Sequence, residues 1–137
     1  ANINNYLPWN IFIPNYSSDS ITARQLMTHT ASIDDNWGVM NLFYGYPDPT
    51  ISLSDCMESY FTTSGSNYDA SSNFLNSAPG ITYDYSNMGS ALNGYIVEAS
   101  TGIPFDDYCD NNLFDELCMV NTAWHFSDFN PKIIIPS

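Results

Sequence analysis

One amphipathic segment in the second half of the chain places the strongest constraint on its fold. Residues 87–100 carry apolar side chains at the spacing of one face of an α-helix of about four turns. Those side chains are Met88, Ala91, Leu92, Tyr95, Ile96 and Ala99. Ser86 precedes the segment as a good N-cap, and Gly102 follows it where helices commonly end in glycine. We therefore expect a helix here whose apolar face packs on the rest of the chain.

Two shorter segments before this helix also carry helix signals. Residues 21–30 begin with a Thr-x-x-Gln capping box, and we expect Leu26 and Met27 of this helix to face inward. Ser52 caps another helix, whose apolar face follows the i, i+4, i+7, i+8 spacing. The members of this face are Leu53, Met57, Tyr60 and Phe61. Residues 31–51, between the two helices, are predicted to be loop.

A fourth helix is predicted after the central one. Pro104 suits a first helical position, and Asp106 and Asp107 suit the first turn, where negative charge is favourable. The fold class that these four helices and their long loops indicate is mainly α. Residues 1–20 read as an irregular lead-in.

The last part of the chain gives weaker signals. Residues 115–119 predict a tight turn in which Leu117 and Met119 are buried, and residues 124–126 are compatible with the start of a strand.

The charge balance excludes several kinds of partner. Fifteen acidic residues stand against Arg24 and Lys132, which gives a formal net charge of −13. Nucleic acid and anionic membrane surfaces are therefore not expected as ligands, since both need clustered cations. No apolar run approaches the ~20 residues of a membrane span, so we expect no span. Hydrophobic residues make up 44% of the chain, which argues for a packed core despite the charge.

Neither a metal nor a cofactor is expected. No pair of the three cysteines forms a Cys-x-x-Cys motif, and the paired acids Asp34-Asp35 and Asp106-Asp107 lack calcium-loop spacing. We interpret these acids as solvated or helix-start charges.

Two interpretations of the cysteines stay open. Either Cys109 and Cys118 bridge a helix to the loop after it, or all three cysteines, with Cys56, are buried free thiols. The low lysine content and the sequon at Asn15 favour an extracellular or lumenal setting.

The candidate site lies directly before the central helix. A Pro79-Gly80 turn leads to Tyr85, Ser86 and Asn87, so that a phenol and an amide are presented at a helix start. Tyr85 and Asn87 are the first candidates for chemistry. His29 is interpreted as a histidine bonded to local backbone, because the sequence shows no partner for a catalytic or metal-binding function.

Four segments carry a family resemblance. Residues 21–30 look like an "ITxRxLLTHTSG" helix, and Pro79-Gly80 with residues 85–87 looks like "PG…YSN". Residues 94–102 are similar to "GyiiE…tG", and residues 113–119 to "iFxPLGM". With all four in order and in register, the chain resembles the serine β-lactamase-related hydrolases over about residues 1–125. This family includes class C β-lactamases, penicillin-binding-protein-like DD-peptidases and related esterases.

The resemblance implies a chemistry and a set of residues. In the family, the serine of a Ser-x-x-Lys motif attacks a carbonyl group and forms an acyl-enzyme. Carried over, Tyr85 would help to transfer the proton, Asn87 would orient the substrate and the lysine, and Ser86 would mainly cap the helix. The implied substrate is a small-molecule or peptide acyl compound: a peptide, a β-lactam or an ester.

The chain also departs from the family pattern. It contains no Ser-x-x-Lys and no Lys-Thr-Gly motif, and Ser32 and Cys118 stand where the family has glycine. Residues 1–137 are therefore predicted to be a single partial domain, the helical region of the α/β fold. We expect it to be inactive alone and to need the remaining parts of the same domain as its partner. The alternative is a non-catalytic structural or binding module descended from that family.

Overall fold

The structure is a computed structural model that describes residues 1–129. Within those residues it is mainly helical and contains no β-sheet, only the isolated bridges Asn2–Thr22 and Ile33–Phe74. The predicted fold class is thus confirmed. The elements in chain order are η1 (Ile3–Asn5), α1 (Ala23–Met27), α2 (Trp37–Phe43), α3 (Leu53–Phe61), α4 (Asn87–Thr101), α5 (Phe105–Cys109), the π-helical η2 (Asp110–Phe114) and η3 (Phe126–Asp128).

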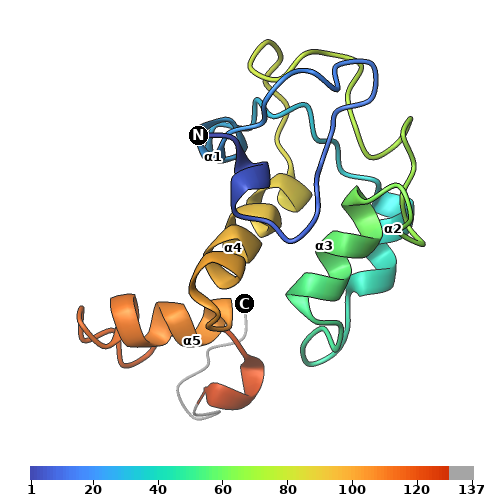
Figure 1. The fold of residues 1–137 in the computed structure, drawn as a ribbon. Helices are drawn as coiled ribbons and strands as arrows, with labels where there is room; N and C mark the ends of the chain where they lie inside the picture. The colour runs from blue at the N-terminus through green and yellow to red at the C-terminus, as the bar shows by residue number, and fades with distance from the viewer. Residues whose placement is uncertain (130–137) are drawn as a thin grey trace.

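Helix α4 is the element around which the others are arranged (Figure 1). It packs against α1, α3 and α5, and it buries Met88, Leu92 and Tyr95, as the periodicity predicts. Its ends are also as predicted. Ser86 Oγ accepts a hydrogen bond from the Gly89 amide at 2.9 Å, and Gly102 ends the helix with a left-handed φ of 71°.

Helices α1, α3 and α5 form where the sequence predicts them. The Thr22–Gln25 capping box is complete, and Ser52 caps α3 through the Asp55 amide. α5 carries Asp106 and Asp107 in its first turn, but it begins one residue later than predicted, so Pro104 is its N-cap and not its first helical residue.

The inward orientation predicted for Met27 is wrong, because this side chain is 73% exposed. α1 has only five residues, so just one side chain, Leu26, reaches the core.

Three further predictions are wrong, all in regions with weak local signals. Residues 31–51 contain the helix α2, and residues 124–126 form no strand but lead into η3. Leu117 and Met119 are exposed. α2 escaped detection because Asn36 makes no side-chain capping bond and the helix contains a glycine, so its position depends on tertiary contacts.

A buried polar cluster supplies those contacts. Asn73 is fully buried; its amide donates to the carbonyls of Tyr60 and Asn67 and accepts from Asn36 Nδ2. The Tyr60 hydroxyl donates to the Asp34 carbonyl and accepts from the Asn36 amide, each at 2.8 Å. Burial raises the pKa of Tyr60 to about 12, so this hydroxyl stays protonated at neutral pH. The cluster fixes the turn that carries Asp35.

Ser32 and Cys118, which stand where the family pattern has glycine, both have a backbone conformation that favours glycine. Ser32 has a φ of 60° and Cys118 a φ of 54°, both in the left-handed region that favours glycine. Ser32 is also buried, and its hydroxyl has no hydrogen-bond partner among residues 1–129. The backbone thus keeps a left-handed conformation at both positions, although neither residue is glycine.

All three cysteines are free thiols. Cys109 is buried, Cys56 is half-buried and Cys118 is exposed, so neither interpretation from the sequence is correct for all three. Burial raises the pKa of Cys56 to about 11, which keeps it an unreactive thiol at neutral pH. None of the helices in residues 1–129 is both long and apolar enough to cross a membrane.

A surface ion pair ties the end of the described chain to α5. His125 Nε2 lies 2.7 Å from Asp106 Oδ2, and Asp48 Oδ2 accepts from the Phe126 amide at 2.9 Å. The hydrogen bond raises the pKa of His125 above its ordinary 6.5 and lowers the pKa of Asp106 below its ordinary 3.8.

These shifts set the pH window of the pair. The contribution of His125 to the stability of the fold is complete below pH 6.5 and is lost as the pH rises through its higher folded pKa. The contribution of Asp106 is present above pH 3.8 and is lost on further acidification. The pair therefore stabilises most between these values, by at most about 1 kcal/mol, because both side chains are more than a third exposed.

Asp106→Asn is expected to lower the pKa of His125 towards 6.5, because the carboxylate that favours the imidazolium is gone. An NMR titration of the imidazole protons measures this shift. Asp107→Asn, one residue along α5, is the matched control and should leave the titration in place. Equal titration curves for the Asp106 variant and the parent protein would contradict the pairing.

Candidate functional site

The structure brings together the two residues predicted for the site. Tyr85 is 56% exposed, and its hydroxyl donates to Asn87 Oδ1 at 3.1 Å. Ser86 lies between them with its backbone extended and its hydroxyl turned inward as the N-cap of α4. The pair is placed by the start of a buried helix, so its position is set by the core and not by a free loop.

Asp35 holds this helix start and is not the solvated acid that the sequence suggested. Its carboxylate accepts four hydrogen bonds. Oδ1 receives Ser86 Oγ and the Met88 amide, both at 3.0 Å, and Oδ2 receives the Asn87 amide at 2.9 Å and Asn87 Nδ2 at 2.7 Å. A negative group beside free amides at a helix N-terminus is also favoured by the helix dipole.

His29 supports the same turn from a second side. Its Nδ1 accepts from the Ser86 amide at 3.2 Å, and its ring lies 4.6 Å from the Tyr85 ring. The ring of Tyr83 lies nearly perpendicular to the imidazole, with the two ring centroids 6.2 Å apart. The sequence interpretation of a backbone-bonded histidine is correct in kind, but the partner is 57 residues away and not local.

Two backbone hydrogen bonds complete the attachment of the turn. The Asp84 amide donates to the His29 carbonyl at 2.9 Å, and the Gly80 amide donates to the Thr30 carbonyl at 2.6 Å. The cavity beneath the turn, lined in part by Leu26, holds only about 10 Å³. This cavity is too small to admit a ligand, and Tyr85 is accessible from its exposed outer side.

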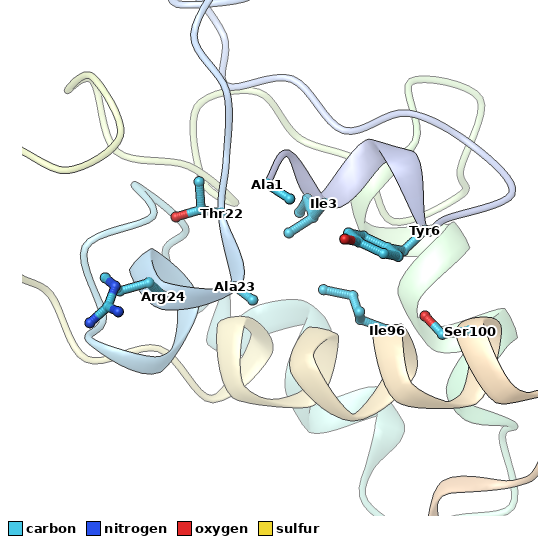
Figure 2. Close-up of a pocket in the computed structure, with 8 residues that line it drawn as sticks. All are labelled: Ala1, Ile3, Tyr6, Thr22, Ala23, Arg24, Ile96 and Ser100. Carbon is cyan, nitrogen blue, oxygen red and sulfur yellow. The ribbon is translucent and has the colours of Figure 1, made fainter.

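A larger groove lies elsewhere on the molecule. It has a volume of about 460 Å³ and is bounded by η1, the start of α1 and the second half of α4. Figure 2 shows Ile3 and Tyr6 on one side of it and Ile96 on the other. None of the site residues named above lines it.

The chemistry available at the site is that of a phenol and an amide. The phenol can donate or accept a hydrogen bond, and the amide can orient a polar partner. No cluster of three or more His, Cys, Asp or Glu side chains able to hold a metal occurs in the part of the chain that the structure describes.

Asp35 and His29 were missed as parts of the site because they lie 51 and 57 residues before Ser86, the residue of the turn that both contact. The one available signal was their position in the sequence: His29 lies in the "THTSG"-like segment, and Asp35 lies just after it.

The family of the chain is shown by a match that covers most of its length. A family model described as Beta-lactamase matches residues 1–132. The chain therefore belongs to the β-lactamase family, within the serine β-lactamase-related lineage. No curated protein matches the sequence.

Proposed function

We propose that residues 1–137 contribute part of the active site of a serine hydrolase, with Tyr85 in proton transfer and Asn87 in orienting the substrate. The observation that carries the proposal is the geometry of the pair: an exposed phenol bonded to an amide that is fixed at the start of α4. Family membership supports these roles, because the pair stands at the Tyr-x-Asn position of the resemblance.

The proposed reaction is acyl transfer to a serine. The serine of a Ser-x-x-Lys motif outside residues 1–137 attacks the carbonyl carbon of a peptide, a β-lactam or an ester. Tyr85, as the phenolate, takes the serine proton and then gives it to the leaving group as the scissile bond breaks. Water later hydrolyses the acyl-serine. Because a phenol is ordinarily a weak base, the motif lysine is needed to stabilise the phenolate.

Acylation of the full native polypeptide tests this proposal. Intact mass is measured after incubation with a chromogenic ester and with a β-lactam, and N-terminal sequencing shows whether Ser-x-x-Lys is present. We expect an acyl adduct on the full polypeptide and none on residues 1–137 alone. A full polypeptide that contains the motif but forms no adduct with either compound would overturn the proposal.

A second candidate function is that of a non-catalytic binding module. It is favoured by the exposed aromatic and aliphatic side chains on and after α2, namely Trp37, Leu42, Tyr44 and Tyr46. A full polypeptide without Ser-x-x-Lys would support this function in place of the hydrolase.

A further inference from the structure

We infer that Asp35 is a positioning residue that fixes the orientation of the Asn87 side-chain amide. This orientation makes Asn87 Oδ1 the acceptor of the hydrogen bond that the Tyr85 hydroxyl donates. The inference rests on the proposed function of Tyr85 and Asn87. It concerns a carboxylate that touches neither the reacting atoms nor Tyr85 itself and acts through Asn87.

The first step is the chemistry of the carboxylate. A carboxylate only accepts hydrogen bonds, and an amide has one donating end and one accepting end. Asp35 Oδ2 lies 2.7 Å from Asn87 Nδ2, the shortest of its four contacts. The reverse orientation of the amide would bring Asn87 Oδ1 against Oδ2, two acceptors with no proton between them. Asp35 therefore turns the amide nitrogen towards itself.

The second step follows at the other end of the amide. With Nδ2 on Asp35, Oδ1 faces the Tyr85 hydroxyl at 3.1 Å. A carbonyl oxygen carries no proton, so the hydroxyl of Tyr85 is the donor in this contact. In the proposed reaction this contact is made while Tyr85 carries a proton, that is, after the phenolate has taken the proton of the serine and before it gives that proton to the leaving group. Asn87 Oδ1 then stabilises the protonated form of Tyr85.

The third step is the rigidity of Asp35. Its own amide donates to Asp34 Oδ1 at 2.7 Å, and the residues on both sides are bonded to the buried Tyr60 hydroxyl. The carboxylate is thus attached to the core, which a positioning residue requires.

Asp35→Ala in the full native polypeptide tests the inference. Without the carboxylate the Asn87 amide can turn over and donate from Nδ2 to Oη. This hydrogen bond favours the phenolate over the phenol and so makes Tyr85 a weaker base towards the serine proton. We expect kcat to fall by about tenfold or more, the scale of one misplaced polar contact in an active site, with a smaller change in KM. In a spectrum of protein labelled with ¹⁵N-asparagine, the Asn87 Nδ2 resonances should move to the shifts of a free amide.

Ser86→Ala is the matched control. It removes one donor to Asp35 and the side-chain cap of α4, so it costs comparable local stability, but it leaves the Asn87–Asp35 contact intact. We expect its Asn87 Nδ2 resonances to stay in place. If Asp35→Ala does not fold, Asp35→Asn is used. The new amide nitrogen deprives at least one of the four donors of its acceptor, and an intermediate loss of kcat is expected.

The outcomes separate the inference from the proposed function. Unchanged Asn87 Nδ2 resonances in the Asp35 variant would overturn the inference, whatever the activity. Unchanged turnover in the Asp35 variant, together with lost turnover in Tyr85→Phe, would overturn the inference and leave the function standing. Unchanged turnover in Tyr85→Phe would overturn the function, and the resonances would still decide the orientation of the amide.

Discussion

Replacing Tyr85 with phenylalanine is expected to lower kcat of the full polypeptide by about 100-fold or more, the typical contribution of a group that transfers a proton. The change removes one oxygen atom from a largely exposed side chain. The ring keeps its contact with His29, and the only hydrogen bond of the hydroxyl within residues 1–129 is the one to Asn87. Folding should therefore be unaffected. Turnover of a chromogenic ester and the melting temperature measure the two effects separately.

Tyr83→Phe is the matched control for this prediction. Tyr83 is exposed, stands two residues away and also approaches the ring of His29, but the side-chain hydrogen bonds of Asn87 go to Tyr85 and Asp35 and not to Tyr83. Its variant should turn over substrate at the parent rate. Equal losses in the two variants would show that the effect is not specific to the Tyr85 hydroxyl, and would contradict its role in proton transfer.

Leu92→Ala is expected to destabilise the fold by about 3 kcal/mol, within the range measured for leucine truncation in packed cores. Leu92 is 0% exposed and lies on the face of α4 that packs against α1 and α3. Removing its side chain leaves a cavity beneath α4. If α4 moved to close this cavity, the Tyr85–Asn87 pair at its start would move with it. Urea unfolding, followed by the helical circular dichroism signal, measures the loss.

Leu42→Ala makes the same chemical change on a surface. Leu42 is a helical residue of α2 and is 72% exposed. Its truncation should change the free energy of unfolding by about 0.5 kcal/mol or less. Equal effects at the two leucines would mean that α4 is not the centre of the core.

The sequence predicted those helices that carry their own start and stop signals. α4 and α3 have serine caps and a clear apolar face, and α1 has a capping box, so local physics decides them. α2 could not be found in this way. Its start is held by Asn36 contacts to Tyr60 and Asn73, which lie 24 and 37 residues further along the chain.

The same division holds for the candidate site. The adjacency of Tyr85 and Asn87 at a helix start follows from local sequence and was predicted, although their catalytic roles remain proposals. The carboxylate of Asp35 and the imidazole of His29 reach them only because residues 29–36 fold back against α4. A pattern of spacing along one segment carries no information about such a contact.

The left-handed backbone at Ser32 and Cys118 has a consequence for how this protein can change. A side chain at such a φ costs of order 1 kcal/mol, and the cost is avoided by glycine. Ser32 adds a buried hydroxyl without a partner among the described residues. Both positions are outside the Tyr85–Asn87 pair. Glycine at either position would relieve this strain but would also increase the conformational entropy of the unfolded chain, so the gain in stability is the difference between the two effects. That gain could offset the cost of new mutations around Tyr85.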